Sequence, residues 1–336
     1  MKTAFFTYPS AFQNVGGGEI VLLKLREYLS KSGTPVDLFD PWKSRVEDYD
    51  VLHVFGSVKD CLGLVQVANA RGVKVVTSPV LWSAPTDLPS LMRHSVKVVF
   101  PAFPSLRREL LMRSDMLFPN SEMEKKHIAR YFAVPEEKMR VVYNGVDKNF
   151  AAADASLWRA RYGGEPFVLS VGRIEPRKNQ LNLIRAMKNM GLKLVLIGDP
   201  VTGYGSYDTS CRAAGAGFAE FIPALPHGDP LLKSAYAACS LFVLQGWFET
   251  PGLAALEAAL AGALIVVTQG GSTREYFGSL ANYLDPASVS SIQKSIRTAL
   301  ARTNDGRLKE HVSSRFTWDK IAQSYAELYR EVSAKK

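Results

Sequence analysis

The sequence contains little cysteine, and its few cysteines follow no pattern that binds metal or builds a disulfide framework. Cys61, Cys211 and Cys239 are the only three in 336 residues. They are odd in number and far apart, with no C-x-x-C pair among them. Such spacing is typical of reduced core residues, so we expect a cytoplasmic protein.

Long apolar runs are also missing. The run at 263–267 is much shorter than the roughly 20 residues that a membrane-spanning helix requires. The N-terminal segment 1–9 holds too short an apolar stretch for a signal peptide and is typical of a first β-strand. From the sequence we expect neither a transmembrane span nor export.

Basic residues outnumber acidic ones, which gives a formal net charge of +9 at pH 7 and a pI of about 9.3. This excess favours contact with anions, but charge alone does not choose among nucleotides, nucleic acid and acidic lipid headgroups. The stretch 93–113 is interpreted either as a solvated helix face or as a surface for peripheral contact with an anionic membrane. Its charged residues are Arg93, Lys97, Arg107, Arg108, Glu109 and Arg113.

Short β-branched and aromatic runs alternate with segments of helical periodicity in both halves of the chain. Strands are predicted at 3–7, 36–39, 51–55, 73–77, 167–171, 192–197, 218–222, 241–244 and 264–268. Helices are predicted at 18–31, 62–71, 179–190, 230–238 and 253–261. Strands separated by helices form a parallel sheet, because each crossover must carry the chain back over the sheet. We therefore predict an α/β fold with two tandem Rossmann-like βαβ domains.

The domain limits follow from the same pattern and from the 37.0 kDa mass, which exceeds what one core usually supports. The N-terminal domain is predicted at 1–150 and the second domain at 165–316. A stretch of polar and small residues at 144–164 is interpreted as the linker. The last segment, 317–336, has apolar residues at helical spacing with no strand after it, which predicts a closing helix.

Two basic residues stand where a predicted strand ends and a helix begins. Gly172 and Arg173 end the strand, and Lys178 precedes the helix. Strand ends in parallel sheets face the ligand crevice, and the free N–H groups of a following helix favour an anion. Arg173 offers a planar fork and Lys178 a mobile point charge, which together could neutralise a diphosphate without a metal. Surface cations paired with carboxylates are an equally good interpretation of the spacing.

A pair of glutamates forms the second motif. Glu249 lies in a loop before a predicted helix, and Glu257 follows inside that otherwise apolar helix. A buried carboxylate without a partner is expensive, so Glu257 should have one. Ribose hydroxyls could donate to it, and an arginine or backbone amides would satisfy it equally well.

Three glycines, Gly16, Gly17 and Gly18, lie between the first strand and the first helix, where the backbone could approach a phosphate closely. The run could be mistaken for a dinucleotide fingerprint. Eight residues separate Thr7, at the end of the strand, from Gly16, whereas the fingerprint needs its glycines in the turn directly after the strand. Its third glycine is replaced by Val21.

Taken together, these motifs resemble the retaining glycosyltransferases of the GT-B fold, of the family 4-like type (glycosyl transferases group 1). The resemblance covers nearly the full chain. It rests on Glu249 and Glu257 with seven residues between them, and on Gly172-Arg173 with Lys178. The glycine loop at 16–19, the segment 143–147 and Trp318 at the start of the closing helix match as well.

The resemblance implies a role for each matching residue. Arg173 and Lys178 would bind the donor diphosphate, Glu257 the ribose and Glu249 the donor sugar, which makes Glu249, Arg173 and Lys178 the implied catalytic residues. The remaining implied donor contacts are phosphate contacts from Gly16, Gly17 and Gly18, backbone N–H groups at Gly252 and Leu253, and base contacts from the loop that holds Pro223 and Leu225.

The implied activity is retaining, metal-independent transfer of a sugar from a nucleotide-diphosphate donor, with no cofactor, in a cleft between the two domains. The acceptor would be a saccharide or lipid-linked molecule in bacterial surface polysaccharide or glycoconjugate synthesis, and no nucleic-acid partner is expected. The closing helix would pack back toward the N-terminal domain. The protein would be cytoplasmic, either free or peripheral at the inner face of the membrane through 93–113.

The sequence departs from the family pattern at two places. Ser78-Pro79 replaces a histidine common near the end of the fourth strand, and Gln245-Gly246 replaces the usual Pro-Ser before the first glutamate. His53 is interpreted as a core histidine in preference to an acceptor contact. The alternatives are a catalytically silent partner subunit and, less favoured, an NAD-dependent oxidoreductase. Donor base, sugar and acceptor do not follow from the sequence.

Overall fold

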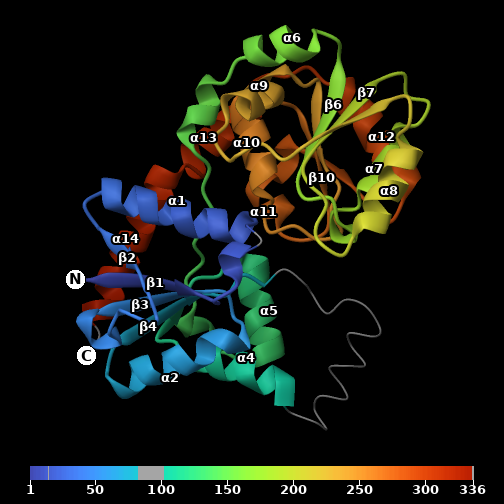
Figure 1. Ribbon diagram of the computed structural model, residues 1–336. Coiled ribbons are helices and arrows are strands. Elements are labelled where there is room, and N and C mark those ends of the chain that lie inside the picture. Colours follow the sequence, from blue (N-terminus) through green and yellow to red (C-terminus); the bar gives the residue numbers. More distant parts are fainter. Residues whose placement is uncertain (14, 82–101, 335–336) are drawn as a thin grey trace. The chain divides into compact units, whose positions relative to one another are not determined.

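The computed structural model describes residues 1–13, 15–81 and 102–334, and the chain divides into two compact α/β units (Figure 1). Unit 1 comprises Met1–Gly145 and Trp318–Lys336, and unit 2 comprises Val146–Thr317. The chain thus enters unit 2 after Gly145 and not after residue 150. The segment 146–164, which was predicted to be largely linker, belongs to unit 2.

Unit 1 is built on one parallel sheet with the strand order β2-β1-β3-β4-β5. Its strands are β1 (Thr3–Thr7), β2 (Val36–Leu38), β3 (Val51–Phe55), β4 (Lys74–Ser78) and β5 (Met116–Leu117). Its helices are α1 (Gly17–Lys31), α2 (Leu62–Ala70), α4 (Ala102–Arg113), α5 (Glu122–Phe132) and α14 (Trp318–Ala334). All five residues of β3 are buried, as expected for a central parallel strand that is covered on both faces.

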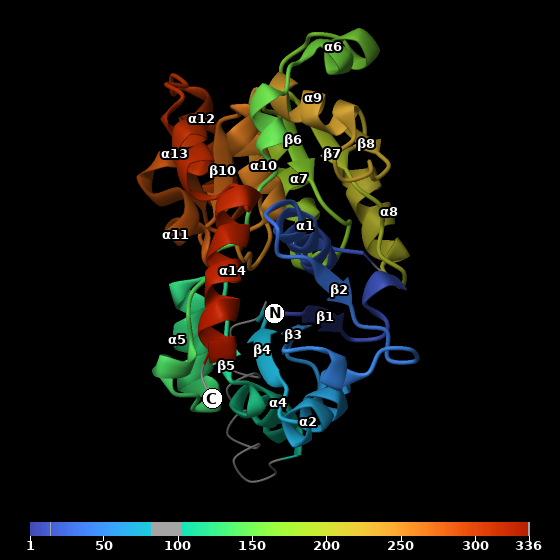
Figure 2. The same ribbon diagram turned by 90° about the vertical axis from the view of Figure 1, so that its left-hand side faces the viewer.

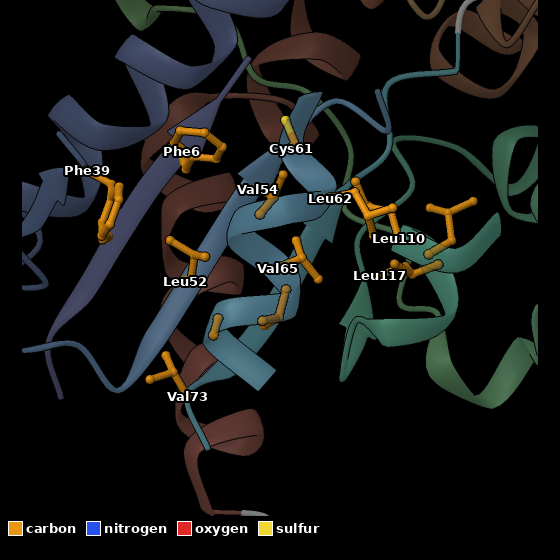
Figure 3. Packing of buried hydrophobic residues seen from close by; sticks show 14 of the residues in the cluster. Phe6, Phe39, Leu52, Val54, Cys61, Leu62, Val65, Val73, Leu110 and Leu117 are labelled. Carbon is orange, nitrogen blue, oxygen red and sulfur yellow. The ribbon is translucent and has the colours of Figure 1, made fainter. Parts of the chain in front are cut away.

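The core of unit 1 lies between the sheet and the helices α2 and α4. Figure 3 shows Leu52 and Val54 of β3 facing Leu62 and Val65 of α2, with Phe6 of β1 beside them. Burying such a side chain completely stabilises the fold by about 1.5–3 kcal/mol. Leu52 and Val54 are two positions apart on β3 and therefore point to the same face of the sheet, which α2 covers.

The closing helix α14 belongs to unit 1, where it contacts α1 (Figure 1). Its Tyr329 hydroxyl lies 2.6 Å from Nδ1 of His53 in β3, and Nε2 of His53 lies 2.9 Å from the Ser78 hydroxyl. Desolvation by burial holds the pKa of His53 well below its usual range, so the ring is neutral. The interpretation of His53 as a satisfied core histidine is confirmed.

Unit 2 holds a six-stranded parallel sheet with the order β11-β10-β9-β6-β7-β8. The labels of β10, β6, β7 and β8 follow this order across Figure 2. The strands are β6 (Phe167–Val171), β7 (Lys193–Ile197), β8 (Ala219–Ile222), β9 (Leu241–Leu244), β10 (Ile265–Thr268) and β11 (Asn282–Leu284). The helices are α6 (Ser156–Tyr162), α7 (Gln180–Met187), α8 (Gly205–Ala214), α9 (Pro230–Ala238), α10 (Leu253–Ala261), α11 (Thr273–Phe277), α12 (Val289–Leu300) and α13 (Arg307–Arg315).

Every strand and helix predicted by residue range occurs within a few residues of its expected bounds. The sequence did not reveal two edge strands, β5 and β11, which are only two and three residues long. It also did not reveal α6, inside the supposed linker. Trp158 of this helix is buried and stacks on the rings of Tyr162 and Phe167, at centroid distances of 4.3 and 5.0 Å, which holds the helix to unit 2.

The cations of α4 engage their own unit. Arg107 Nε donates to the Ser57 carbonyl at 2.8 Å, Arg108 Nε to the Phe132 carbonyl at 2.9 Å, and Arg113 pairs with Glu109 at 2.8 Å. For the described part of 93–113, these contacts within unit 1 favour a helix face over a surface for membrane contact. Arg93 and Lys97 lie outside the described residues.

The described part of the chain contains neither a candidate membrane span nor a candidate metal cluster. No helix there is long and apolar enough to cross a membrane. No three histidine, cysteine or acidic side chains of the described ranges come together as metal ligands do. The three cysteines are free and buried, and desolvation raises the pKa of Cys61 to about 12.

We expect Tyr329→Phe to lower the free energy of unfolding of unit 1 by about 1–3 kcal/mol, because it leaves Nδ1 of the buried His53 without its partner. Tyr325→Phe is the matched control. Its hydroxyl lies 3.3 Å from that of Ser78, which keeps His53 as a partner, so the loss should be smaller. Chemical denaturation of both variants measures this, and equal losses would contradict the assigned network.

Candidate functional site

The candidate site lies where the strand order of unit 2 reverses. From β6 the chain moves to β7 on one side and later to β9 on the other, and β6 pairs with β9 through Val168–Leu241 and Leu169–Phe242. The loops that leave the carboxyl ends of β6 and β9 are therefore neighbours. Open α/β sheets bind their ligands at such a switch point.

The two loops bring together two of the predicted residues. Lys178 ends a 3-10 turn at Pro176–Lys178, and its Nζ lies 2.7 Å from Oε1 of Glu249. Only 5% of the Glu249 side chain is exposed, against 19% for Lys178. The predicted diphosphate lysine and the predicted sugar glutamate thus form a shielded ion pair across the switch point.

Arg173 lies on the first of these loops and is the more exposed cation, with 38% of its side chain accessible. Its Nη2 lies 3.4 Å from Oε1 of Glu175, and Arg177 reaches the same oxygen at 3.0 Å. The Arg173 carbonyl accepts a hydrogen bond from Gln180 at 2.8 Å, which fixes the backbone. Because Arg173 and Arg177 share the single carboxylate of Glu175, this group of side chains keeps a net positive charge that would attract an anion.

Glu249 is held by the chain on both sides. Its N–H donates to the Gly270 carbonyl, and its carbonyl accepts from Ser272, both at 3.0 Å. A Cβ at Gly246 would collide with the Glu249 carboxylate in its observed position. A side chain at position 246, such as the usual serine of the family pattern, would therefore require the Glu249 carboxylate to shift from this position.

Gln245, the other departure from that pattern, ties the two loops together. It accepts from the Ser170 hydroxyl of β6 at 3.0 Å and donates through Nε2 to the Lys178 carbonyl at 2.9 Å. The backbone carbonyl of Gln245 accepts a hydrogen bond from Nδ2 of Asn179 at 3.2 Å. The available sequence signal was a glutamine directly after the apolar run of β9. The structure shows that this glutamine is buried, and a buried amide needs hydrogen-bond partners.

Helix α10 supplies the second glutamate. The backbone turns into it at Gly252, where φ is +84° and an added Cβ would meet the Leu244 side chain. Glu257 lies about one turn further on and is 7% exposed. Its partners are the Tyr236 hydroxyl, 2.9 Å from Oε2, and Nε2 of His227, 3.0 Å from Oε1.

The expectation that Glu257 is buried and paired is confirmed, but its partners are neither an arginine nor backbone amides. The sequence did not single out Tyr236 or His227. Burial and the neighbouring Glu257 raise the pKa of Tyr236 well above its usual range, which keeps its hydroxyl protonated and donating.

The other predicted contacts are more exposed or lie in unit 1. Pro223 is exposed in the loop between β8 and α9, and Leu225 is half-buried. Gly16 caps α1 and its N–H donates to Glu19 at 2.8 Å, while Gly17 and Gly18 form the first turn. The roles of these residues toward a donor stay predictions.

The arrangement of unit 1 argues against a dinucleotide fingerprint. A 3-10 turn at Ala11–Gln13 lies between the end of β1 at Thr7 and the start of α1 at Gly17. The glycines are therefore not in a tight turn directly after the strand.

Family comparisons agree with this geometry. The sequence model of the family Glycosyl transferases group 1 matches residues 159–313, and that of Glycosyltransferase Family 4 matches residues 41–150. The chain belongs to the group 1 glycosyltransferases, of the family 4-like type. The predicted family and the α/β GT-B fold class are thereby confirmed.

Curated relatives of this glycosyltransferase chain are distant in sequence. A D-inositol 3-phosphate glycosyltransferase of Segniliparus rotundus is 27% identical over 290 residues, which cover 81% of the chain and 62% of the relative. An uncharacterized glycosyltransferase of Methanocaldococcus jannaschii is 27% identical over 230 residues, covering 62% and 58%. The matched region thus spans about three-fifths of the length of these relatives.

Solved structures share the fold over nearly the whole chain. Sucrose-phosphate synthase from Thermosynechococcus elongatus superposes with a TM-score of 0.80 at 18% identity and covers 100% of both chains. Anabaena HepE in complex with UDP gives a TM-score of 0.77 at 18% identity, covering 98% of this chain and 100% of HepE.

We expect Gln245→Leu to speed amide hydrogen exchange at Lys178 and Asn179 and to lower the free energy of unfolding of unit 2 by about 1–3 kcal/mol. The change leaves the Ser170 hydroxyl and the Lys178 carbonyl without a partner. Gln293→Leu, which removes one half-buried contact to the Ala186 carbonyl, is the control. Unchanged exchange at Lys178 in the Gln245 variant would contradict its tie to the loop.

Proposed function

We propose that this chain is a retaining, metal-independent glycosyltransferase that moves a sugar from a nucleotide-diphosphate donor to a saccharide or lipid-linked acceptor. The observation that carries the proposal is the contact between Lys178 and Glu249 at the switch point of unit 2, beside Arg173. Lys178 would bind the leaving diphosphate, and Glu249, which contacts Lys178, would bind the transferred sugar.

The donor diphosphate would displace Glu249 as the partner of Lys178 and would also bind the planar guanidinium group of Arg173. The free N–H groups at the start of α10, near Gly252 and Leu253, would add further donors. Both cations would then face the charge that develops on the leaving phosphate, and no metal is needed to neutralise it. Front-face displacement, in which the leaving diphosphate helps to remove the acceptor proton, follows from the family resemblance.

The two glutamates would divide the donor between them. Glu257, already desolvated, would accept from the ribose hydroxyls. Glu249 would hold the sugar ring, because a carboxylate that is 5% exposed needs a new partner once the diphosphate has taken Lys178. The loop that holds Pro223 and Leu225 would contact the base.

A uridine nucleotide is the first donor to test, because the fold neighbour HepE is described in complex with UDP and with UDP-glucose. Unit 1 would bind the acceptor, and a role in bacterial surface polysaccharide or glycoconjugate synthesis stays a proposal. Attachment to an anionic membrane through 93–113 also stays a prediction, although the described arginines Arg107, Arg108 and Arg113 contact their own chain.

The test begins with thermal stabilisation by UDP-, GDP- and ADP-sugars, since a ligand that binds only the native state raises its melting temperature. With the best nucleotide diphosphate, we expect Arg173→Ala and Lys178→Ala each to weaken binding by about 1.5–3 kcal/mol, the size of a charge-assisted hydrogen bond. Isothermal calorimetry measures the loss.

Lys193→Ala is the matched control, because Lys193 also pairs with a glutamate, Glu220, but lies at the amino end of β7, whereas the site lies at the carboxyl ends of the strands. Its affinity for the nucleotide should be that of the unaltered protein. Unchanged affinity in the Arg173 and Lys178 variants would remove the basis of the proposal.

A further inference from the structure

The carboxylate of Glu257 can accept more hydrogen bonds than its two protein partners donate. An ionised carboxylate offers about four lone-pair positions on its two oxygens. Tyr236 takes one on Oε2 and His227 takes one on Oε1, at 2.9 and 3.0 Å. With respect to the residues that the structure describes, one position on each oxygen remains, which matches the two hydroxyls of a vicinal diol.

The two protein partners hold this carboxylate from different elements. Tyr236 comes from α9 and is fully buried, with its ring against Phe150 and Phe242 at centroid distances of 5.9 and 5.6 Å. His227 comes from the loop between β8 and α9, and 21% of its side chain is exposed. The tyrosine therefore cannot turn away without repacking the core, whereas the histidine reaches in from the surface.

His227 also links two parts of the proposed donor site. It lies in the same loop as Pro223 and Leu225, and its contact fastens that loop to α10 through Glu257. The ring lies edge-on to Phe150, at a centroid distance of 6.4 Å. A loop that would face the base is thus coupled to the carboxylate that would face the ribose.

We infer that His227 and Tyr236 are positioning residues that hold the Glu257 carboxylate so that its two open acceptor positions select a vicinal diol. The inference rests on the proposed function and adds to it the source of selectivity for a ribonucleotide over a 2′-deoxyribonucleotide. Neither residue touches the reacting atoms. Each acts through Glu257, because preorganised acceptors lose less rotational freedom when the ligand binds.

The experiment measures the ratio of affinities for UDP and 2′-deoxy-UDP by calorimetry. The unaltered protein should prefer UDP by about tenfold or more, the size of one lost hydrogen bond to a charged group. Tyr236→Phe and His227→Ala should each lower this ratio by about threefold or more. His227→Gln, whose amide can still donate, should restore most of it.

Tyr283→Phe is the control for a lost tyrosine hydroxyl, because Tyr283 donates to the Gly278 carbonyl beside β11, away from Glu257. Its ratio should stay that of the unaltered protein. A change in folding would shift both affinities together, whereas the ratio reports on the sugar alone. If Tyr236→Phe is too unstable to measure, the His227 variants still test the inference, because His227 is only half-buried.

The outcomes separate the inference from the proposed function. If UDP binds and the ratio is the same in the Tyr236 and His227 variants, the inference is wrong and the proposed function stands. Tighter UDP binding by His227→Ala would also overturn it, since the histidine would then compete with the ribose. If UDP, GDP and ADP all fail to bind the unaltered protein, the donor proposal fails and the inference fails with it.

Discussion

The parallel pairing of β6 with β9 is the constraint on which the candidate site depends. The five residues of β6 and the four of β9 are almost all apolar and buried, so the pairing is set by core packing. It places the carboxyl ends of two strands, which are distant in the sequence, next to each other. Arg173, Lys178 and Glu249 meet only because those ends are neighbours.

The buried carboxylate of Glu249 then couples the binding of the diphosphate to the binding of the sugar in the proposed donor. Glu249 is too shielded to be left without a partner, and in the structure Lys178 is that partner. An anion that takes Lys178 obliges Glu249 to find another donor, and a sugar hydroxyl is the donor that the proposed substrate brings. Gly246 leaves the space for the observed pair, and Gln245 holds the lysine loop to β6.

Much of this could be predicted from the sequence, because strands with continuous apolar runs and helices of clear periodicity leave strong signals. The burial of Glu257 followed from the alanines and leucines around it. The partners of Glu257 did not follow, since Tyr236 and His227 lie 21 and 30 positions earlier and meet it only through tertiary packing. Helix α6 was taken for linker because one residue, Trp158, supplies most of its buried surface.

The most direct test of the account is a double-mutant cycle on Lys178 and Glu249, with UDP affinity measured by calorimetry. Glu249→Gln removes the charge that competes with the diphosphate for Lys178, so UDP should bind more tightly, by roughly three- to tenfold, because the shielded ion pair no longer has to be broken. In a Lys178→Met background the same change should have no such effect. Weaker UDP binding by Glu249→Gln, or an equal gain in both backgrounds, would contradict the claim that the diphosphate and Glu249 share Lys178.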